Sequence, residues 1–181
     1  MLQSTGARRV RAYAFLVAAA VLSGAAGTAS RHDRIVVGSV THLPLPRFAS
    51  LRSDDINLRV GPGRRYPIAW ILHRRFLPVE IKREFKEWRQ IRLPDGTEGW
   101  VHSGTIIARR SFYVKTGPLR TVHAAATKHS SPVARLQAHV VGRIVSCAAQ
   151  VTWCRVEVGS VEGYLERDAF WGTFAAEAVP G

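Results

Sequence analysis

Pro67-Ile68-Ala69 recurs in this sequence as Pro132-Val133-Ala134, which begins 65 positions later. The same step of 65 positions relates three further pairs of residues: Val79 and Ile144, Trp88 and Trp153, and Ile91 and Val156. Gly99-Trp100-Val101 then returns as Gly163-Tyr164-Leu165, one residue out of step. An offset held this constant indicates two copies of one small module. The repeat argues against one large catalytic core and favours tandem binding or spacer modules.

The first copy has the pattern of short strands separated by turns. Ile56-Asn57-Leu58-Arg59-Val60 and Trp88 to Leu93 alternate apolar and polar side chains, which is typical of half-buried β-strands. Pro94-Asp95-Gly96 predicts a tight turn, because proline presets φ and glycine accepts a positive φ. Gly99-Trp100-Val101-His102 is then the returning strand of a hairpin. About five such strands in each copy predict an all-β chain of two small tandem barrels.

The N-terminal segment has the pattern of a secretory signal peptide. Arg8, Arg9 and Arg11 form a positive region, and Ala12 to Leu22 is uncharged and mostly apolar. That stretch is shorter than the ~20 residues that span a bilayer, and small residues follow it. We expect cleavage after Ala29, with Ala26 as the alternative, and a periplasmic or secreted product without a stable membrane span. An uncleaved membrane anchor is the competing interpretation.

The chain is strongly basic, with a formal net charge of +13 over 181 residues. Loss of residues 1–29 removes three arginines and leaves +10. In an exported protein such a charge favours anionic partners, such as cell-wall polymer, lipopolysaccharide, anionic lipid or acidic protein. Nucleic acid fits the charge but not the compartment, so it is not an expected partner.

Cys147 and Cys154 are the two cysteines, and both lie in the second copy. A pair of cysteines in an exported chain predicts a disulfide, and a hairpin of short strands would place them opposite each other. Metal binding is the alternative, but the spacing is not C-x-x-C and no histidine stands at a ligand-like spacing. We therefore predict a disulfide, with no metal and no cofactor.

These features divide the chain into six segments. Residues 1–29 are the signal peptide and 30–50 an extended tail, followed by the first domain at 51–108 and a connector at 109–119. Residues 120–172 are the second domain, and 173–181 are a C-terminal tail that is expected to fray because small residues dominate it. Phe112-Tyr113-Val114 in the connector is a candidate strand.

The motifs of the first copy resemble those of the bacterial SH3-like (SH3b) domain. They are Asn57-Leu58-Arg59-Val60-Gly61-Pro62-Gly63, Tyr66-Pro67-Ile68, Trp88, and Asp95-Gly96-x-x-Gly99-Trp100-Val101. Trp153-Cys154-Arg155-Val156 and Trp171-Gly172 in the second copy are similar to runs in exported proteobacterial proteins with two SH3-like domains. The sequence departs from the pattern at Phe76, where such domains usually have glycine. The second copy also lacks the Asn-x-Arg-x-Gly-Pro signature.

The resemblance implies a binding protein, with a surface of the first barrel as its site. Flat aromatic rings suit sugar faces and extended peptides, and arginine forks bind carboxylates and phosphates. The candidate ligand-binding residues are Arg59, Tyr66, Trp70, Trp88, Trp100 and His102. Packing inside a small barrel is the alternative role for Trp88 and Trp100, and packing beside the Gly-Pro-Gly turn is the alternative for Tyr66.

Three functions are compared on this basis. The preferred hypothesis is a non-enzymatic, exported tandem SH3-like protein that binds cell-envelope material, namely peptidoglycan or a short peptide. The alternative is a scaffold that binds an envelope protein and has no affinity for the polymer. An enzyme such as a wall hydrolase finds little support, because the sequence has no G-x-S-x-G elbow or phosphate loop and both cysteines are expected to be paired.

Overall fold

The computed structural model describes residues 36–181 of the chain. The predicted signal peptide, residues 1–29, and residues 30–35 of the expected tail lie outside the described residues. The described residues, 36–181, all lie in one compact unit. Within the described part, no helix is long and apolar enough to cross a membrane.

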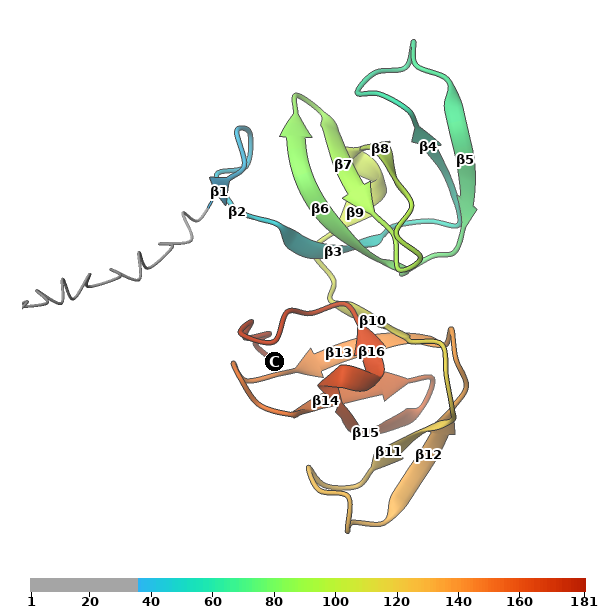
Figure 1. Ribbon diagram of the computed structural model, residues 1–181, viewed down its shortest axis with the longest axis vertical. Helices are drawn as coiled ribbons and strands as arrows, with labels where there is room; N and C mark the ends of the chain where they lie inside the picture. Colours follow the sequence, from blue (N-terminus) through green and yellow to red (C-terminus); the bar gives the residue numbers. More distant parts are fainter. Residues whose placement is uncertain (1–35) are drawn as a thin grey trace, which may run out of the picture. The chain divides into compact units, whose positions relative to one another are not determined.

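Seven antiparallel strands form the first sheet, in the spatial order β5-β4-β8-β7-β6-β3-β9 (Figure 1). They are β3 (Arg47–Leu51), β4 (Asp55–Arg59), β5 (Ile68–His73), β6 (Pro78–Phe85), β7 (Trp88–Arg92), β8 (Glu98–His102) and β9 (Ile106–Ile107). The predicted alternation is present in β4, where Ile56 and Leu58 are buried and Asn57 is exposed. The predicted hairpin joins β7 to β8, and Gly96 in its turn has a φ of 89°.

The second sheet repeats the first strand by strand, in the order β12-β11-β15-β14-β13-β10-β16. Its strands are β10 (Ser111–Val114), β11 (Arg120–His123), β12 (Pro132–Leu136), β13 (Val141–Ser146), β14 (Trp153–Val158), β15 (Val161–Glu166) and β16 (Phe170–Trp171). A short 3-10 helix precedes the last strand of each sheet, η1 (Ser103–Thr105) and η2 (Arg167–Ala169). The repeat and the all-β tandem architecture predicted from the sequence are confirmed.

Each sheet encloses its own apolar core. The first core contains Leu51, Ile56, Leu58, Val79, Ile91 and Val101, and the second contains Phe112, Val114, Val122, Val156, Leu165 and Phe170. These residues are almost fully buried, so burial of apolar area is the main stabilising contribution in each barrel.

Both sheets begin earlier in the sequence than the predicted domain boundaries. β3 lies in the segment expected to be an extended tail, and β10 lies in the expected connector. β3 pairs with β6 through contacts such as Ser50 with Pro78, and β10 pairs with β13. Such distant pairing leaves no signal in the local sequence. The candidate strand at Phe112-Tyr113-Val114 is confirmed as part of β10.

The N-terminal tail contains a small hairpin of β1 (Val36–Val37) and β2 (Pro44–Leu45). The side chain of Glu84 in β6 is fully buried, and its carboxylate holds the turn of this hairpin. The main-chain N–H groups of Val40 and Thr41 donate to Glu84 Oε2 over 3.0 and 2.9 Å. Thr41 Oγ1 and Arg47 Nη2 donate to Oε1, each over 2.7 Å. Burial raises the pKa of Glu84, but these hydrogen bonds outweigh it and lower the pKa to about 2.

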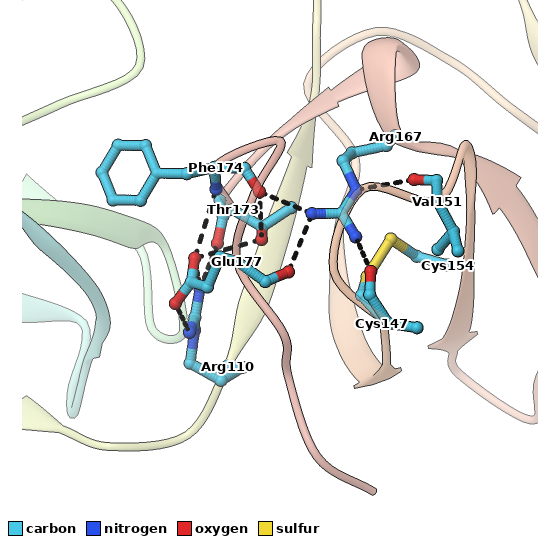
Figure 2. Close-up of a disulfide and its surroundings, with 10 residues drawn as sticks. Arg110, Cys147, Val151, Cys154, Arg167, Thr173, Phe174 and Glu177 are labelled. Atoms are coloured by element: carbon cyan, nitrogen blue, oxygen red, sulfur yellow. Dashed lines mark hydrogen bonds and ion pairs between the residues drawn. A yellow bond between two sulfur atoms is a disulfide. The ribbon is translucent and has the colours of Figure 1, made fainter. Parts of the chain in front are cut away.

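The C-terminal tail is anchored, so the prediction that it frays is wrong. Val179 is 3% exposed, and it exchanges two main-chain hydrogen bonds with Cys147 over 2.9 and 2.8 Å. The Glu177 carboxylate accepts hydrogen bonds from Arg110 and from the Phe174 N–H (Figure 2). The small residues of the tail gave no hint of this, because the anchoring groups lie far away in the sequence.

The predicted disulfide between Cys147 and Cys154 is confirmed, with the two Cα atoms 4.6 Å apart. Arg167 holds the loop that the disulfide closes, since its guanidinium donates to the carbonyl oxygens of Ala148 and Val151 (Figure 2). The same guanidinium donates to the carbonyl oxygen of Glu177 over 3.0 Å. Arg167 therefore links the disulfide loop to the C-terminal tail by hydrogen bonds.

Phe76 occupies a left-handed conformation, with a φ of 63°. This explains why the family pattern favours glycine at that position, because a residue with a Cβ is strained there. Two guanidinium groups lie over the Phe76 ring, those of Arg75 at 4.7 Å and Arg109 at 4.4 Å from its centroid. These cation–π contacts offset part of the backbone strain.

Residues of the two sheets also contact one another within the compact unit. The buried hydroxyl groups of Ser50 and Ser111 lie 2.5 Å apart, and Ser50 also donates to the carbonyl oxygen of Arg109. The ring of Phe48 packs edge-on against Trp171, with 4.7 Å between the ring centroids. A buried hydrogen bond and a packed aromatic pair of this kind distinguish the junction from a flexible linker.

Candidate functional site

Four of the six predicted site residues lie on one face of the first sheet. Arg59 of β4 stands opposite Trp100 of β8, and His102 of β8 stands opposite Trp88 of β7. Directly opposed residues on neighbouring strands point to the same face, and so do residues two apart on one strand. Trp100 and His102 are two apart on β8, so the Arg59–Trp100 pair and the Trp88–His102 pair belong to one surface. The opposite face of these strands carries core residues such as Val101.

A pocket of about 480 Å³ lies at this surface. It is lined by Asp55, Ile56, Asn57, Arg59, Arg64, Trp88, His102 and Thr105. We call it the first-barrel pocket. It contains three of the predicted residues, Arg59, Trp88 and His102, and the alternation of β4 adds Asp55 and Asn57 from the same face as Arg59.

Trp88 and His102 form the aromatic wall of the first-barrel pocket. Their rings are edge-to-face, with centroids 5.6 Å apart and an angle of 88° between the planes. Trp88 is only 8% exposed, so little of its surface is open to a ligand, although it lies outside the apolar core of the barrel. His102 caps η1 by accepting a hydrogen bond from the Gly104 N–H at Nδ1 over 3.1 Å. In the neutral ring this leaves the proton on Nε2.

The basic side of the pocket comes from Arg59 and Arg64. Arg59 Nη1 donates to the carbonyl oxygens of Tyr66 and Arg64, over 2.7 and 3.2 Å. These two bonds fix both the guanidinium and the turn that follows β4. The Arg64 side chain is exposed, and among residues 36–181 no carboxylate pairs with it. It is therefore available to an anionic group.

Asp55 is the one carboxylate that lines the first-barrel pocket. Its Oδ1 lies 2.7 Å from Nδ1 of His73, and both side chains are largely exposed. Two guanidinium groups against one carboxylate leave the pocket positive. A ligand with a carboxylate or phosphate fits this charge, because guanidinium forks bind both groups well.

Tyr66 has a structural role beside the pocket and does not line it. Its ring covers the Gly61-Pro62-Gly63 turn so closely that a Cβ on Gly61 would lie 2.4 Å from Cδ1 of the ring. The Tyr66 carbonyl oxygen receives the hydrogen bond from Arg59. Tyr66 thus shapes the turn and holds Arg59 in place.

Trp70 and Trp100 also lie outside the lining of the pocket. Trp100 is half-buried on the same face, beside Arg59 in register. Trp70 is 63% exposed and belongs to β5, which is the last strand at one edge of the sheet. The six predicted residues are therefore not one site, and Trp70 belongs to a separate surface.

The residues that sequence reasoning missed are Asp55, Asn57, Arg64 and Thr105. The signal for Asp55 and Asn57 was present, because period-2 alternation puts both on the face of Arg59. Arg64 belongs to a basic run that gives no positional information. Thr105 is the last residue of η1, a single turn of helix that no sequence pattern indicated.

The second barrel has different chemistry at the equivalent place. Trp153 stands opposite Glu166, in the register that Trp88 and His102 have in the first barrel. Glu166 is paired with Lys128 over 3.0 Å. The Trp153 ring is edge-on to His123, with centroids 5.4 Å apart. The Lys128–Glu166 ion pair thus stands where the first barrel has its positively charged pocket. The two copies therefore cannot bind the same ligand in the same way.

A further pocket, of about 700 Å³, lies in the second barrel beside the disulfide loop and the C-terminal tail. Arg167 is one of its charged residues, but its guanidinium is already bonded to carbonyl oxygens of the loop and tail. Lys115 donates to the carbonyl oxygen of Asp168. The cations here hold the chain together, so the first-barrel pocket remains the better candidate. Within residues 36–181, no group of three or more His, Cys, Asp or Glu side chains is placed to hold a metal ion.

Comparison with known proteins identifies the first barrel. Residues 52–107 match the family model described as "Bacterial SH3 domain". No curated protein matches the chain. Among solved structures, NlpC2 and NlpC1 from Trichomonas vaginalis each give a TM-score of 0.33, at 11% and 12% identity. The alignments cover 71% and 77% of this chain, and 48% and 50% of those proteins. This chain thus spans about half the length of either NlpC protein.

A third solved structure is a putative autolysin from Listeria monocytogenes, with a TM-score of 0.30 and 13% identity. The alignment covers 70% of this chain and 62% of that protein.

Proposed function

We propose that the protein is an exported, non-enzymatic binding protein for cell-envelope material, because residues 52–107 match the family model of the bacterial SH3 domain. Its ligand is peptidoglycan or a short peptide, and the first-barrel pocket makes the contact. The observation that carries the proposal is the convergence of Arg59, Trp88 and His102 on one pocket, with the unpaired cation of Arg64 at its side.

The chemistry of the pocket suits the stem peptides of a cell wall. Such peptides carry carboxylates on an extended backbone, beside sugar rings with apolar faces. Arg64 supplies a guanidinium for a carboxylate, Trp88 and His102 supply aromatic surface, and Asn57 supplies amide hydrogen-bonding groups. The proposal assigns no bond-making or bond-breaking step to the chain.

Export is part of the proposal. It is supported by the signal-peptide pattern of residues 1–29 and by the Cys147–Cys154 disulfide, which is typical of proteins in oxidising compartments. The remaining net charge of +10 favours an anionic envelope. We place the protein in the periplasm or outside the cell on these grounds.

The test is retention on isolated peptidoglycan sacculi across a salt series. The protein used is Ser30–Gly181, which contains the whole compact unit. Arg64→Ala is compared with Arg65→Ala, since both remove one exposed arginine from the same turn and only Arg64 lines the pocket.

The proposal predicts that retention persists at salt concentrations that screen general charge attraction and falls severalfold in Arg64→Ala alone. Equal losses in both variants, or release by modest salt, would mean that charge alone carries the binding. A sharp, salt-insensitive complex with one envelope protein and no retention on sacculi would favour the scaffold function instead.

A further inference from the structure

β5 is an exposed, apolar strand at the edge of the first sheet (Figure 1). It pairs with β4 on one side, and no other described strand covers its second side. Four of the exposed large apolar side chains lie on β5 or in the loop before it: Val60 (60% exposed), Ile68 (45%), Trp70 (63%) and Ile71 (51%). Proteins usually protect such an edge with charge, proline or a covering segment, because its unpaired N–H and C=O groups are a template for another strand.

The second copy shows the usual protection at the equivalent edge. This protection does not come from proline, because Pro132 at the start of β12 repeats Pro67 directly before β5. It comes from polar residues on the strand and directly after it. In the repeat alignment Arg135 stands where the first copy has Trp70, and Gln137 stands where it has Leu72. The edge of the second copy thus carries polar residues at two positions that are apolar in the first copy. The fold of the module therefore tolerates an arginine at the position that Trp70 occupies in the first copy.

The charge around β5 indicates which kind of strand fits. Residues 56–79 contain five arginines and no aspartate or glutamate. Arg64 and Arg65 lie before β5, and Arg74 and Arg75 lie after it, all four exposed. Pairing β5 with β5 of a second copy would bring arginines together at both ends, in either strand direction. An acidic strand would instead be attracted, most strongly at the end beside Arg64 and Arg65, because Asp54 and Asp55 lie near Arg75 and His73 at the other end.

We propose that the free edge of β5 binds an extended acidic segment of a partner protein by strand addition. Main-chain hydrogen bonds to the edge provide affinity, as in other strand-addition complexes. Apolar side chains at alternate positions of the added strand pack on Trp70, and carboxylates at its ends meet Arg65 on one side and Arg74 or Arg75 on the other. This function goes beyond binding in the first-barrel pocket and does not depend on it.

The probe is a blocked eight-residue peptide that alternates valine and glutamate. Two control peptides have lysine in place of glutamate, or N-methyl groups on the valines, which remove main-chain donors. Amide hydrogen exchange of Ser30–Gly181 is followed over β5 and over β12, together with the apparent mass of the protein. We expect exchange in β5 to slow at least tenfold with the acidic peptide only, and β12 to remain unchanged.

Trp70→Arg, which installs the residue of the second copy, should abolish this protection, whereas Val133→Arg on β12 should not. Unchanged exchange in the β7–β8 hairpin would show that Trp70→Arg is folded. Retention of Trp70→Arg on sacculi should match wild type, which separates this site from the first-barrel pocket. The proposal is overturned by absence of β5 protection, by equal protection with the lysine or N-methyl peptide, or by β5 protection that accompanies dimer formation.

Discussion

Arg59 Nη1 donates a hydrogen bond to the carbonyl oxygen of Tyr66 over 2.7 Å. This bond ties the end of β4 to the turn that leads into β5. It places a guanidinium in the first-barrel pocket and leaves the Tyr66 ring to cover the turn. Arg59 and Tyr66 were both predicted from the sequence as ligand contacts. Arg59 lines the pocket, whereas Tyr66 holds Arg59 in place and does not line it.

Replacement of Arg59 tests this link. Arg59→Ala removes two hydrogen bonds to carbonyl oxygens, and we expect the free energy of unfolding to fall by about 1–3 kcal/mol, since bonds to charged donors contribute more than neutral ones. Urea unfolding measures the change. Arg83→Ala, which removes an exposed arginine of β6, is the control and should change stability little. Equal stability of the two variants would show that Arg59 does not hold the turn.

The packing of Tyr66 against the turn predicts a difference between two glycines. Gly61→Ala places a methyl group 2.4 Å from the ring, so the ring must move, and we expect a loss of about 1–3 kcal/mol in stability. Gly63→Ala makes only ordinary contact at 3.4 Å and should change stability less. Thermal unfolding of both variants gives the comparison. Similar losses at the two positions would contradict the close packing described for Gly61.

The buried carboxylate of Glu84 predicts acid sensitivity of the N-terminal hairpin. Its folded pKa of about 2 lies below the ordinary value of 4.5, so its contribution to stability is present above pH 4.5 and is lost as the pH falls toward 2. The protection factors for hydrogen exchange at Val40 and Thr41 should therefore fall across this window. Glu84→Gln should expose the hairpin at neutral pH and flatten the pH dependence. Glu87→Gln, an exposed neighbour, should resemble wild type, and the same behaviour in both variants would refute the role of Glu84.

The disulfide and the C-terminal tail are expected to stabilise each other. Replacing both Cys147 and Cys154 with serine opens a short loop and should cost about 2–3 kcal/mol. Because Val179 pairs with the main chain of Cys147, the tail should loosen as well. Proteolysis near Ala175 and Ala176 would report this release. A tail that stays protected in the serine variant would show that Arg110 and Arg167 anchor it without the disulfide.

The sequence predicted the fold well because the fold depends on patterns that repeat. The offset of 65 residues, the alternation in β4 and the turn at Gly96 are local signals, and each appears in the structure. The sequence did not indicate that β3 and β10 are strands of the two sheets or that the C-terminal tail is anchored, because distant partners hold these segments. Ser50 pairs with Pro78, and Glu177 pairs with Arg110, which lies 67 positions away.

The candidate site was predicted only in part, for a geometric reason. Residue type indicated which side chains suit a ligand, but not which of them share a surface. Register brings Arg59, Trp88 and His102 to one pocket, whereas Trp70 lies on an edge strand. The sequence alone does not distinguish Arg64 from the other arginines of its basic run. The structure does, because the turn before β5 brings Arg64 to the pocket.

The most direct test of the central claim is an NMR titration of Ser30–Gly181 with soluble muropeptides. The second barrel provides an internal control, because Trp153 and His123 repeat the edge-to-face pair of Trp88 and His102 in a different charge environment. The account predicts that the side-chain signals of Trp88 and His102 shift during the titration, while those of Trp153 and His123 stay in place. Shifts confined to the second barrel, or no shifts in either, would contradict recognition of the cell wall by the first-barrel pocket.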